Sequence, residues 1–246
     1  MLAFGISWLG SAPNLAAAWG LPVFTSSLWR ATLVLAATGP ALAAGLVVRW
    51  AGLRRLPLVE PAGWLWYALA GGLPLISTVG ARLLAQWVPH PPTPTPLRGA
   101  GFSWFLLLSG LTNPWEELGW RGFALRRLQA LYPAAQAALV VGVLWALWHL
   151  PLFLLPAGPL SMADKPVVAW VAGVLAQPFI LTWLFNRAAG SLPVVMLYHV
   201  AANACGAWLG VPSEWALTAL KVALAAGLWS LAGPVRPAAP TSAGLA

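Results

Sequence analysis

The chain has 246 residues, of which 60% are hydrophobic and only 7% are charged, and its mean hydropathy is +0.79. Because a soluble domain carries about 25% charged residues, this composition excludes a soluble protein and a disordered one, and the single cysteine, Cys205, excludes a disulfide scaffold. The net charge of +8 comes from 13 Lys and Arg against 5 Asp and Glu, but the basic residues are scattered, so we predict no nucleic-acid partner. The composition indicates a protein embedded in a lipid bilayer.

Long apolar runs predict an all-α fold, a multipass transmembrane helical bundle with about eight spans. A helical span needs about 20 mostly apolar residues, because the hydrocarbon core is about 30 Å thick and a helix rises about 1.5 Å per residue. Backbone groups in lipid must be paired internally, so these runs indicate helices. The first run is the weakest of the set, and the seven that follow it are clear. In chain order the runs are 2–19, 28–50, 63–88, 101–118, 135–155, 166–186, 192–209 and 214–231.

A proline-rich stretch, 89–96, predicts an extended connector between two parts of the chain. We expect N-terminal transmembrane helices with this connector in 1–98, a catalytic transmembrane domain in 99–233, which holds nearly all the informative polar residues, and a disordered tail in 234–246.

Basic residues in short loops predict the orientation, because they favour the cytoplasmic side. Eight of them follow alternate runs and three lie on the opposite side, which places both termini in the cytoplasm; if the first run does not span, only the N-terminus moves outside. The abundance of Arg, Ala and Gly is typical of a GC-rich bacterium, so we expect a bacterial plasma membrane. The cytoplasmic set is Arg49, Arg54, Arg55, Arg121, Arg126, Arg127, Arg187 and Arg236, and the opposite set is Arg30, Arg98 and Lys165.

Two adjacent acids, Glu116 and Glu117, close the fourth run, where unpaired charge in an apolar span is costly. Arg121 lies at helical i,i+4 spacing from Glu117, so it can hold that carboxylate ionised and leave Glu116 free to act as a base. A structural alternative is that Asn113 caps a new helix, with Pro114 at its first position and Glu116 completing a capping box. Capping does not explain the second glutamate.

His149 lies inside the fifth run, two residues before Pro151, which is expected to kink the helix. An intramembrane histidine either hydrogen-bonds between helices or serves as a metal ligand, a base partner or a proton relay. His199 and Asn203 share one face of the seventh run at i,i+4 spacing. They are suited to contacts between helices, to stabilising an oxyanion, or to holding a ligand.

If these helices converge, the site combines carboxylates, two imidazoles and an amide inside the membrane. Such a set can activate water and stabilise a tetrahedral oxyanion. It can equally bind a divalent metal such as Zn through Glu116, His149 and His199, with one coordination position open.

The three motifs resemble those of the membrane-embedded CAAX prenyl protease and bacteriocin-processing (CPBP, or Abi) family. That family carries Glu-Glu-x-x-x-Arg, then Phe-x-x-x-His, then His-x-x-x-Asn, and Glu116 to Arg121 and His199 to Asn203 match the first and third motifs. His149 matches the second, with Trp145 in place of the usual Phe. Each motif alone is weak, but their order and spacing match over 101–210.

The resemblance implies an intramembrane endopeptidase acting on a membrane protein or peptide. Glu116 would activate water with His149 as its partner, and His199 with Asn203 would polarise the scissile carbonyl or hold its oxyanion. Glu117 and Arg121 would support these groups. The family has been described both with and without a metal, so the metal stays open.

The position of the glutamates places the expected active site towards the cytoplasmic side. The alternatives to an enzyme are a non-enzymatic membrane binding or immunity scaffold, in which the polar cluster is structural, and a proton-coupled transporter. Because the acids cluster at one end of a span, a transport pathway across the bilayer is disfavoured.

Overall fold

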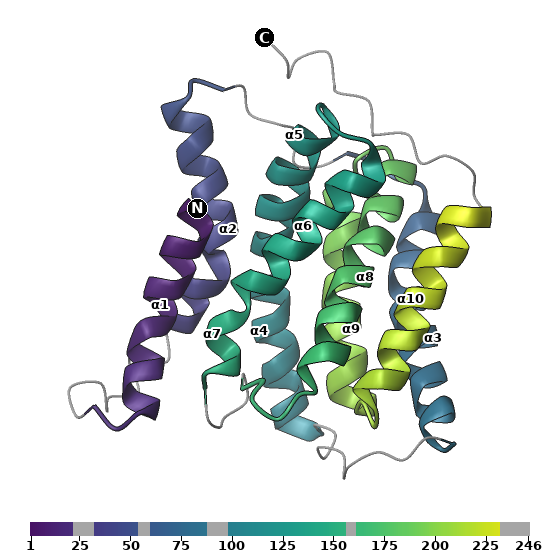
Figure 1. The fold of residues 1–246 in the computed structure, drawn as a ribbon. Helices are drawn as coiled ribbons and strands as arrows, with labels where there is room; N and C mark the ends of the chain where they lie inside the picture. Colours follow the sequence, from purple (N-terminus) through teal and green to yellow (C-terminus); the bar gives the residue numbers. More distant parts are fainter. Residues whose placement is uncertain (22–31, 54–59, 88–97, 156–160, 232–246) are drawn as a thin grey trace.

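The computed structural model describes residues 1–21, 32–53, 60–87, 98–155 and 161–231, and these residues form helices and no strand. The predicted all-α fold is confirmed (Figure 1). The elements are α1 (Leu2–Ala18), α2 (Thr32–Trp50), α3 (Trp64–Ala85), α4 (Gly99–Glu117), the π-helix η3 (Leu118–Leu125), α5 (Arg126–Gln129), α6 (Ala134–Trp148), α7 (Leu150–Phe153), α8 (Val167–Arg187), α9 (Leu192–Leu209) and α10 (Glu214–Leu231).

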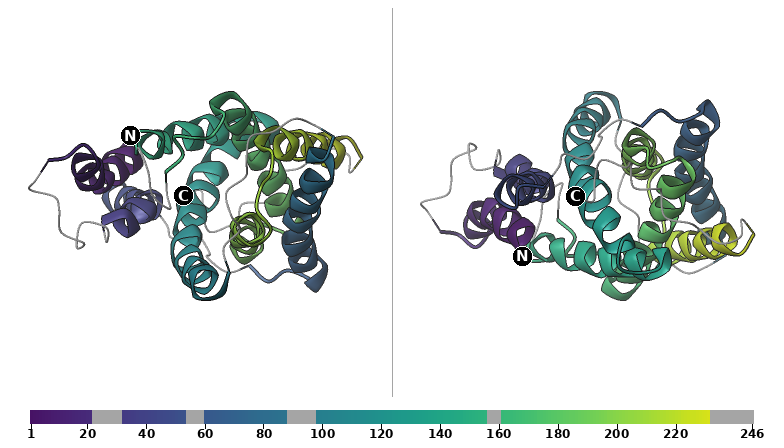
Figure 2. Two further views of the ribbon diagram at one scale, coloured as in Figure 1. Left: turned by 90° about the horizontal axis from the view of Figure 1, so that it is seen from below. Right: turned by 90° about the horizontal axis from the view of Figure 1, so that it is seen from above.

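The helices form a bundle with a hairpin at one edge. End-on views place α1 and α2 at one edge and α3 and α10 at the opposite one, with α4, α6, α8 and α9 between them (Figure 2). The core gathers apolar side chains such as Val141, Phe185 and Tyr198 from α6, α8 and α9. Because α3 packs against α9 and α10, helices from both sides of the proline-rich stretch share one bundle.

Three described helices, α3, α8 and α9, are long and apolar enough to cross a membrane, and two apolar helices, Val34–Trp50 and Ala134–Trp148, are shorter. These helices indicate a membrane-embedded chain, and the count of about eight spans stays a prediction. The domain boundaries also stay predictions, and both the connector, 89–96, and the tail, 234–246, lie outside the described residues.

Arginines lie in the last turn of α2, α5 and α8, and these three helix ends all lie at the upper end of the bundle in Figure 1. The predicted side is therefore shared by Arg49, Arg126, Arg127 and Arg187. Arg121 was wrongly counted with the loops, because it lies inside η3 and is fully buried. Which end faces the cytoplasm stays a prediction.

The helix of the first motif does not end where the sequence indicated. The apolar run was expected to stop near Leu118, but α4, η3 and α5 follow one another without a break to Gln129. The capping alternative is wrong, because Asn113 and Pro114 lie inside α4. Pro114 has no N–H to continue the helical hydrogen bonding, and the backbone widens into the π-helix directly after Glu117. The two glutamates thus lie within a continuous helical stretch, not at its end.

The run containing His149 is split, as the kink expected at Pro151 implies. The helix α6 ends at Trp148, His149 forms its C-cap, and α7 begins at Leu150. Pro151 cannot donate the backbone hydrogen bond that would continue α6. The interruption turns the chain at the second motif.

Candidate active site

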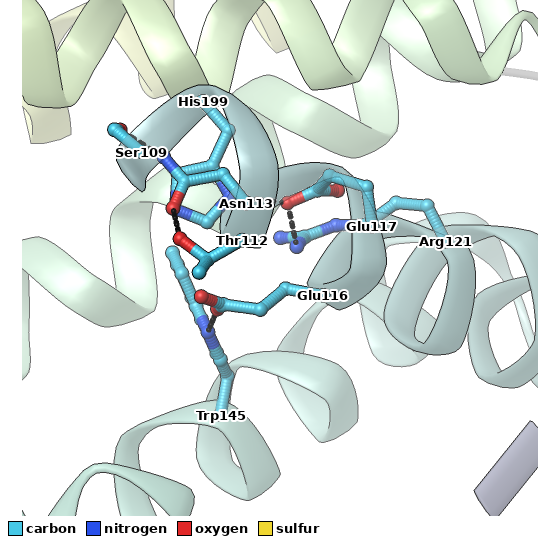
Figure 3. A network of polar contacts seen from close by, with 8 residues as sticks. All are labelled: Ser109, Thr112, Asn113, Glu116, Glu117, Arg121, Trp145 and His199. Atoms are coloured by element: carbon cyan, nitrogen blue, oxygen red, sulfur yellow. Dashed lines mark hydrogen bonds and ion pairs between the residues drawn. The ribbon is translucent and has the colours of Figure 1, made fainter. Parts of the chain in front are cut away.

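A buried ion-pair network joins the first and third motifs. Oε1 of Glu117 lies 3.0 Å from Nη1 of Arg121 and 2.8 Å from Nδ1 of His199. The side chains of Glu117 and Arg121 are fully buried, and His199 is nearly so. The i,i+4 ion pair predicted from the sequence is confirmed, and it links α4 and η3 to α9 (Figure 3).

Glu116 points to a different neighbour. Its Oε2 atom accepts a hydrogen bond of 3.0 Å from the indole Nε1 of Trp145 on α6. Successive helix residues are rotated by about 100°, so the adjacent glutamates face different helices, as Figure 3 shows. Glu117 is paired with a cation, whereas Glu116 is held by a neutral donor.

His149 is oriented by its own helix. Its Nδ1 lies 2.7 Å from the carbonyl oxygen of Trp145. A carbonyl can only accept, so Nδ1 carries the proton and Nε2 of the neutral ring is an acceptor. The imidazole is enclosed by indole rings, with centroids 5.3 Å away in Trp145, 4.8 Å in Trp148 and 5.3 Å in Trp170.

The three motifs meet around Trp145. Its ring centroid lies 5.3 Å from that of His149 and 5.4 Å from that of His199, and the guanidinium carbon of Arg121 lies 5.1 Å from it. The hydrogen bond to Glu116 completes the set. The structure thus brings Glu116, Glu117, Arg121, His149 and His199 into one cluster.

Asn203 stands apart from this network. It follows His199 by one turn of α9 and is half-buried. Among the described residues, no side chain or backbone group hydrogen-bonds to its amide. Asn203 and His199 lie on the same helix, α9, at the predicted i,i+4 spacing, and the amide has no hydrogen-bond partner in the described part of the chain.

The sequence reasoning missed polar neighbours in α4. Nδ2 of Asn113 donates a hydrogen bond of 2.8 Å to Oγ of Ser109, and both side chains are buried. The sequence does carry a signal for this, since Ser109, Asn113, Glu117 and Arg121 recur every fourth residue and form one polar stripe on an apolar helix. From the sequence Trp145 was only a departure from the motif, although in the structure it contacts Glu116, Arg121, His149 and His199.

The metal site considered from the sequence stays a prediction. In the described part of the chain, no group of three or more His, Cys, Asp or Glu side chains could hold a metal ion. Nδ1 of His199 is engaged by Glu117, which leaves Nε2 as its remaining nitrogen. Glu116, His149 and His199 are not gathered as a three-ligand set in the described part of the chain.

Comparisons with known proteins agree with the motif resemblance. Residues 99–205 match the family model described as type II CAAX prenyl endopeptidase Rce1-like. CAAX prenyl protease 2 of Methanococcus maripaludis is 31% identical over 103 residues, which cover 40% of this chain and 37% of that protein. The chain thus matches little more than a third of that relative's length. The family-model match contains all six residues singled out from the sequence: Glu116, Glu117, Arg121, His149, His199 and Asn203.

Proposed function

We propose, from the Rce1-like family sequence of residues 99–205, that this chain is an intramembrane endopeptidase that hydrolyses a peptide bond of a membrane-associated protein or peptide. The observation that carries the proposal is the shared Oε1 of Glu117, which joins Arg121 and His199 in a buried network next to Glu116. Fully buried charges are costly in a membrane protein unless they serve a purpose. Here they hold two of the motifs in contact.

Glu116 is the proposed general base. Its carboxylate takes a proton from water while the water oxygen bonds to the scissile carbonyl carbon and the carbonyl π electrons move onto the oxygen. Because Glu117 is paired with Arg121, the second negative charge is compensated, and Glu116 keeps its basicity for water. His149, with Nε2 as an acceptor, is the proposed partner that orients this water.

His199 and Asn203 are proposed to stabilise the oxyanion. The carboxylate of Glu117 accepts from Nδ1 of His199 and orients the ring, and in this proposal Nε2 of the doubly protonated imidazole is the donor to the oxyanion. The amide of Asn203, one turn along the same face, supplies a second donor. When the tetrahedral intermediate collapses, the C–N bond breaks and the departing amine takes up the proton that Glu116 removed from water, which restores the carboxylate. Glu117 and Arg121 act as positioning residues.

The substrate class follows by analogy with the relative named CAAX prenyl protease 2. We propose that a lipidated C-terminal peptide is the first substrate to test, and that the scissile bond is reached from the cytoplasmic side. Peptides of the bacteriocin type and other membrane proteins are the alternatives.

The test uses the full chain purified into liposomes, with an internally quenched farnesylated peptide ending in Cys-Ala-Ala-X as the probe. We expect a C-terminal fragment, identified by mass spectrometry, and a rate about 10²- to 10⁴-fold lower for Glu116→Gln, as for loss of a general base. His149→Ala should also be inactive. A matched control is Glu214→Gln, because Glu214 pairs at 2.7 Å with the partly exposed Lys165, away from the cluster.

Near-normal cleavage by Glu116→Gln and His149→Ala would overturn the proposed mechanism. If the wild-type chain cleaves neither this peptide nor a panel of unlipidated membrane peptides but still retains a partner, the scaffold alternative is favoured.

A further inference from the structure

The second motif of this chain differs from the usual family pattern at one ring. Trp145 occupies the position where the family carries Phe, and a Phe ring has no hydrogen-bond donor. In this structure the extra donor is used, because the indole Nε1 lies 3.0 Å from Oε2 of Glu116. The substitution therefore adds a polar contact to the residue proposed as the base.

The contact is buried and fixed at both ends. The side chains of Trp145 and Glu116 are both buried, and the indole is packed between the imidazoles of His149 and His199. A hydrogen bond from a neutral donor to a carboxylate is stronger than one between neutral groups. Rotation of Glu116 away from the cluster would break it and leave a buried indole N–H unpaired.

We propose that Trp145 is a positioning residue that acts through Glu116, with its indole N–H fixing one carboxylate oxygen so that the other is available to water. This inference rests on the proposed function, since it assigns a role in orienting the general base. The hydrogen bond engages Oε2 alone, and Glu116 forms no ion pair with Arg121, whose charge is taken by Glu117. The carboxylate is thus oriented without being neutralised.

The test compares Trp145→Phe with an isosteric replacement of Trp145 by 3-benzothienylalanine, in which sulfur replaces the N–H and the ring shape is kept. Both remove the donor, and only the Phe variant also changes the packing. The control is Trp183→Phe on α8, because this indole is also buried but its N–H has no partner in the described structure. Each variant is assayed in liposomes with the farnesylated Cys-Ala-Ala-X probe, and kcat and KM are measured separately.

We expect both Trp145 variants to lose about 10- to 100-fold in kcat, as for loss of a hydrogen bond to a charged group. KM should stay within about twofold, because the contact acts on the base and does not hold the ground-state substrate. The Trp183→Phe control should match the wild type.

If 3-benzothienylalanine keeps full activity, the proposal is overturned, whether or not the Phe variant is active, because Trp145 then acts only through its shape. A fall in both kcat and unfolding temperature for the isostere would indicate a structural role and would overturn it too. The proposed function is tested separately by the wild type. If the wild-type chain fails to cleave the probe or the membrane-peptide panel, the proposed function fails and this inference fails with it.

Discussion

Glu117 and His199 are 82 residues apart in the sequence and lie on different helices, yet Oε1 of Glu117 and Nδ1 of His199 are 2.8 Å apart. The same carboxylate oxygen contacts Arg121. Because the bond joins α4 to α9, the geometry of the proposed oxyanion site depends on a carboxylate that does not itself touch the substrate. The buried network should therefore contribute to the free energy of unfolding.

Removing one charge of the buried pair should destabilise the protein more than removing both. Glu117→Gln leaves the guanidinium of Arg121 buried without a counter-ion, for which we expect a loss of about 3–5 kcal/mol in the free energy of unfolding. The double variant Glu117→Gln with Arg121→Gln removes both charges and should recover part of the loss. Unfolding midpoints of the purified variants in detergent measure the difference. Equal midpoints for the wild type and both variants would contradict the proposed contribution of the pair.

The close approach of the N-terminal hairpin to the site predicts a second effect. Gly119 of η3 packs against the backbone of Pro40 on α2, and a Cβ atom at position 119 would overlap that backbone. Gly119→Ala should therefore push α2 away and lower stability by about 1–3 kcal/mol, as overpacking does.

Gly110→Ala is the matched control, because a Cβ added at Gly110 of α4 meets nothing within 4 Å. We expect this variant to keep or raise the unfolding midpoint, since Ala favours a helix over Gly. If Gly119→Ala and Gly110→Ala unfold at the same midpoint, α2 moves to accommodate the added methyl group without loss of stability, and the prediction is wrong.

The sequence predicted the helical class and the residues of the cluster because a membrane chain places its few polar groups where they are needed. Five acids in the whole chain made the pair Glu116 and Glu117 conspicuous, and helical spacing was sufficient to predict the contact with Arg121. Helical spacing does not predict contacts between different helices. Neither the bond from Glu117 to His199 nor that from Trp145 to Glu116 has a spacing rule, because each depends on how α4, α6 and α9 pack.

The continuation of α4 was missed for a local reason. Asn113 and Pro114 favour the start of a helix when they follow a loop, but here they lie within an apolar span whose backbone must stay paired. The helix therefore runs through them and widens at η3. The residues alone allowed a helix that begins at Asn113 or one that continues through it, and the packing and the membrane environment favour the continuous helix.

Metal removal tests the arrangement of the imidazoles. Because no group of three or more His, Cys, Asp or Glu side chains among the described residues is placed to hold a metal ion, we expect probe cleavage to be unchanged after dialysis against a chelator. The metal content of the purified protein, measured by atomic emission, should be well below one ion per chain. Loss of cleavage that zinc restores would mean instead that Glu116, His149 and His199 gather around an ion and displace the indole.

Alanine variants of Asn203 and Asn113 should differ in effect, the first lowering activity and the second lowering stability. Asn203 forms no hydrogen bond within the described residues, so Asn203→Ala should leave the unfolding midpoint unchanged. If its amide holds the oxyanion, the same change should lower kcat by about 10²- to 10³-fold, as loss of one oxyanion donor does. Asn113 is buried and hydrogen-bonded to Ser109. Asn113→Ala leaves that polar partner unsatisfied, so it should lower the free energy of unfolding by about 1–3 kcal/mol and lower the unfolding midpoint with it.

The paired comparison makes the result decisive, because both variants remove the same amide from a helix of the bundle. Activity is measured as kcat on the farnesylated probe, and stability as the unfolding midpoint in the same detergent. An Asn203→Ala variant with full activity would remove this amide from the oxyanion site and leave His199 as the remaining donor. A variant that loses stability in proportion to activity would assign Asn203 to packing between helices, as its place among small residues on α9 also permits.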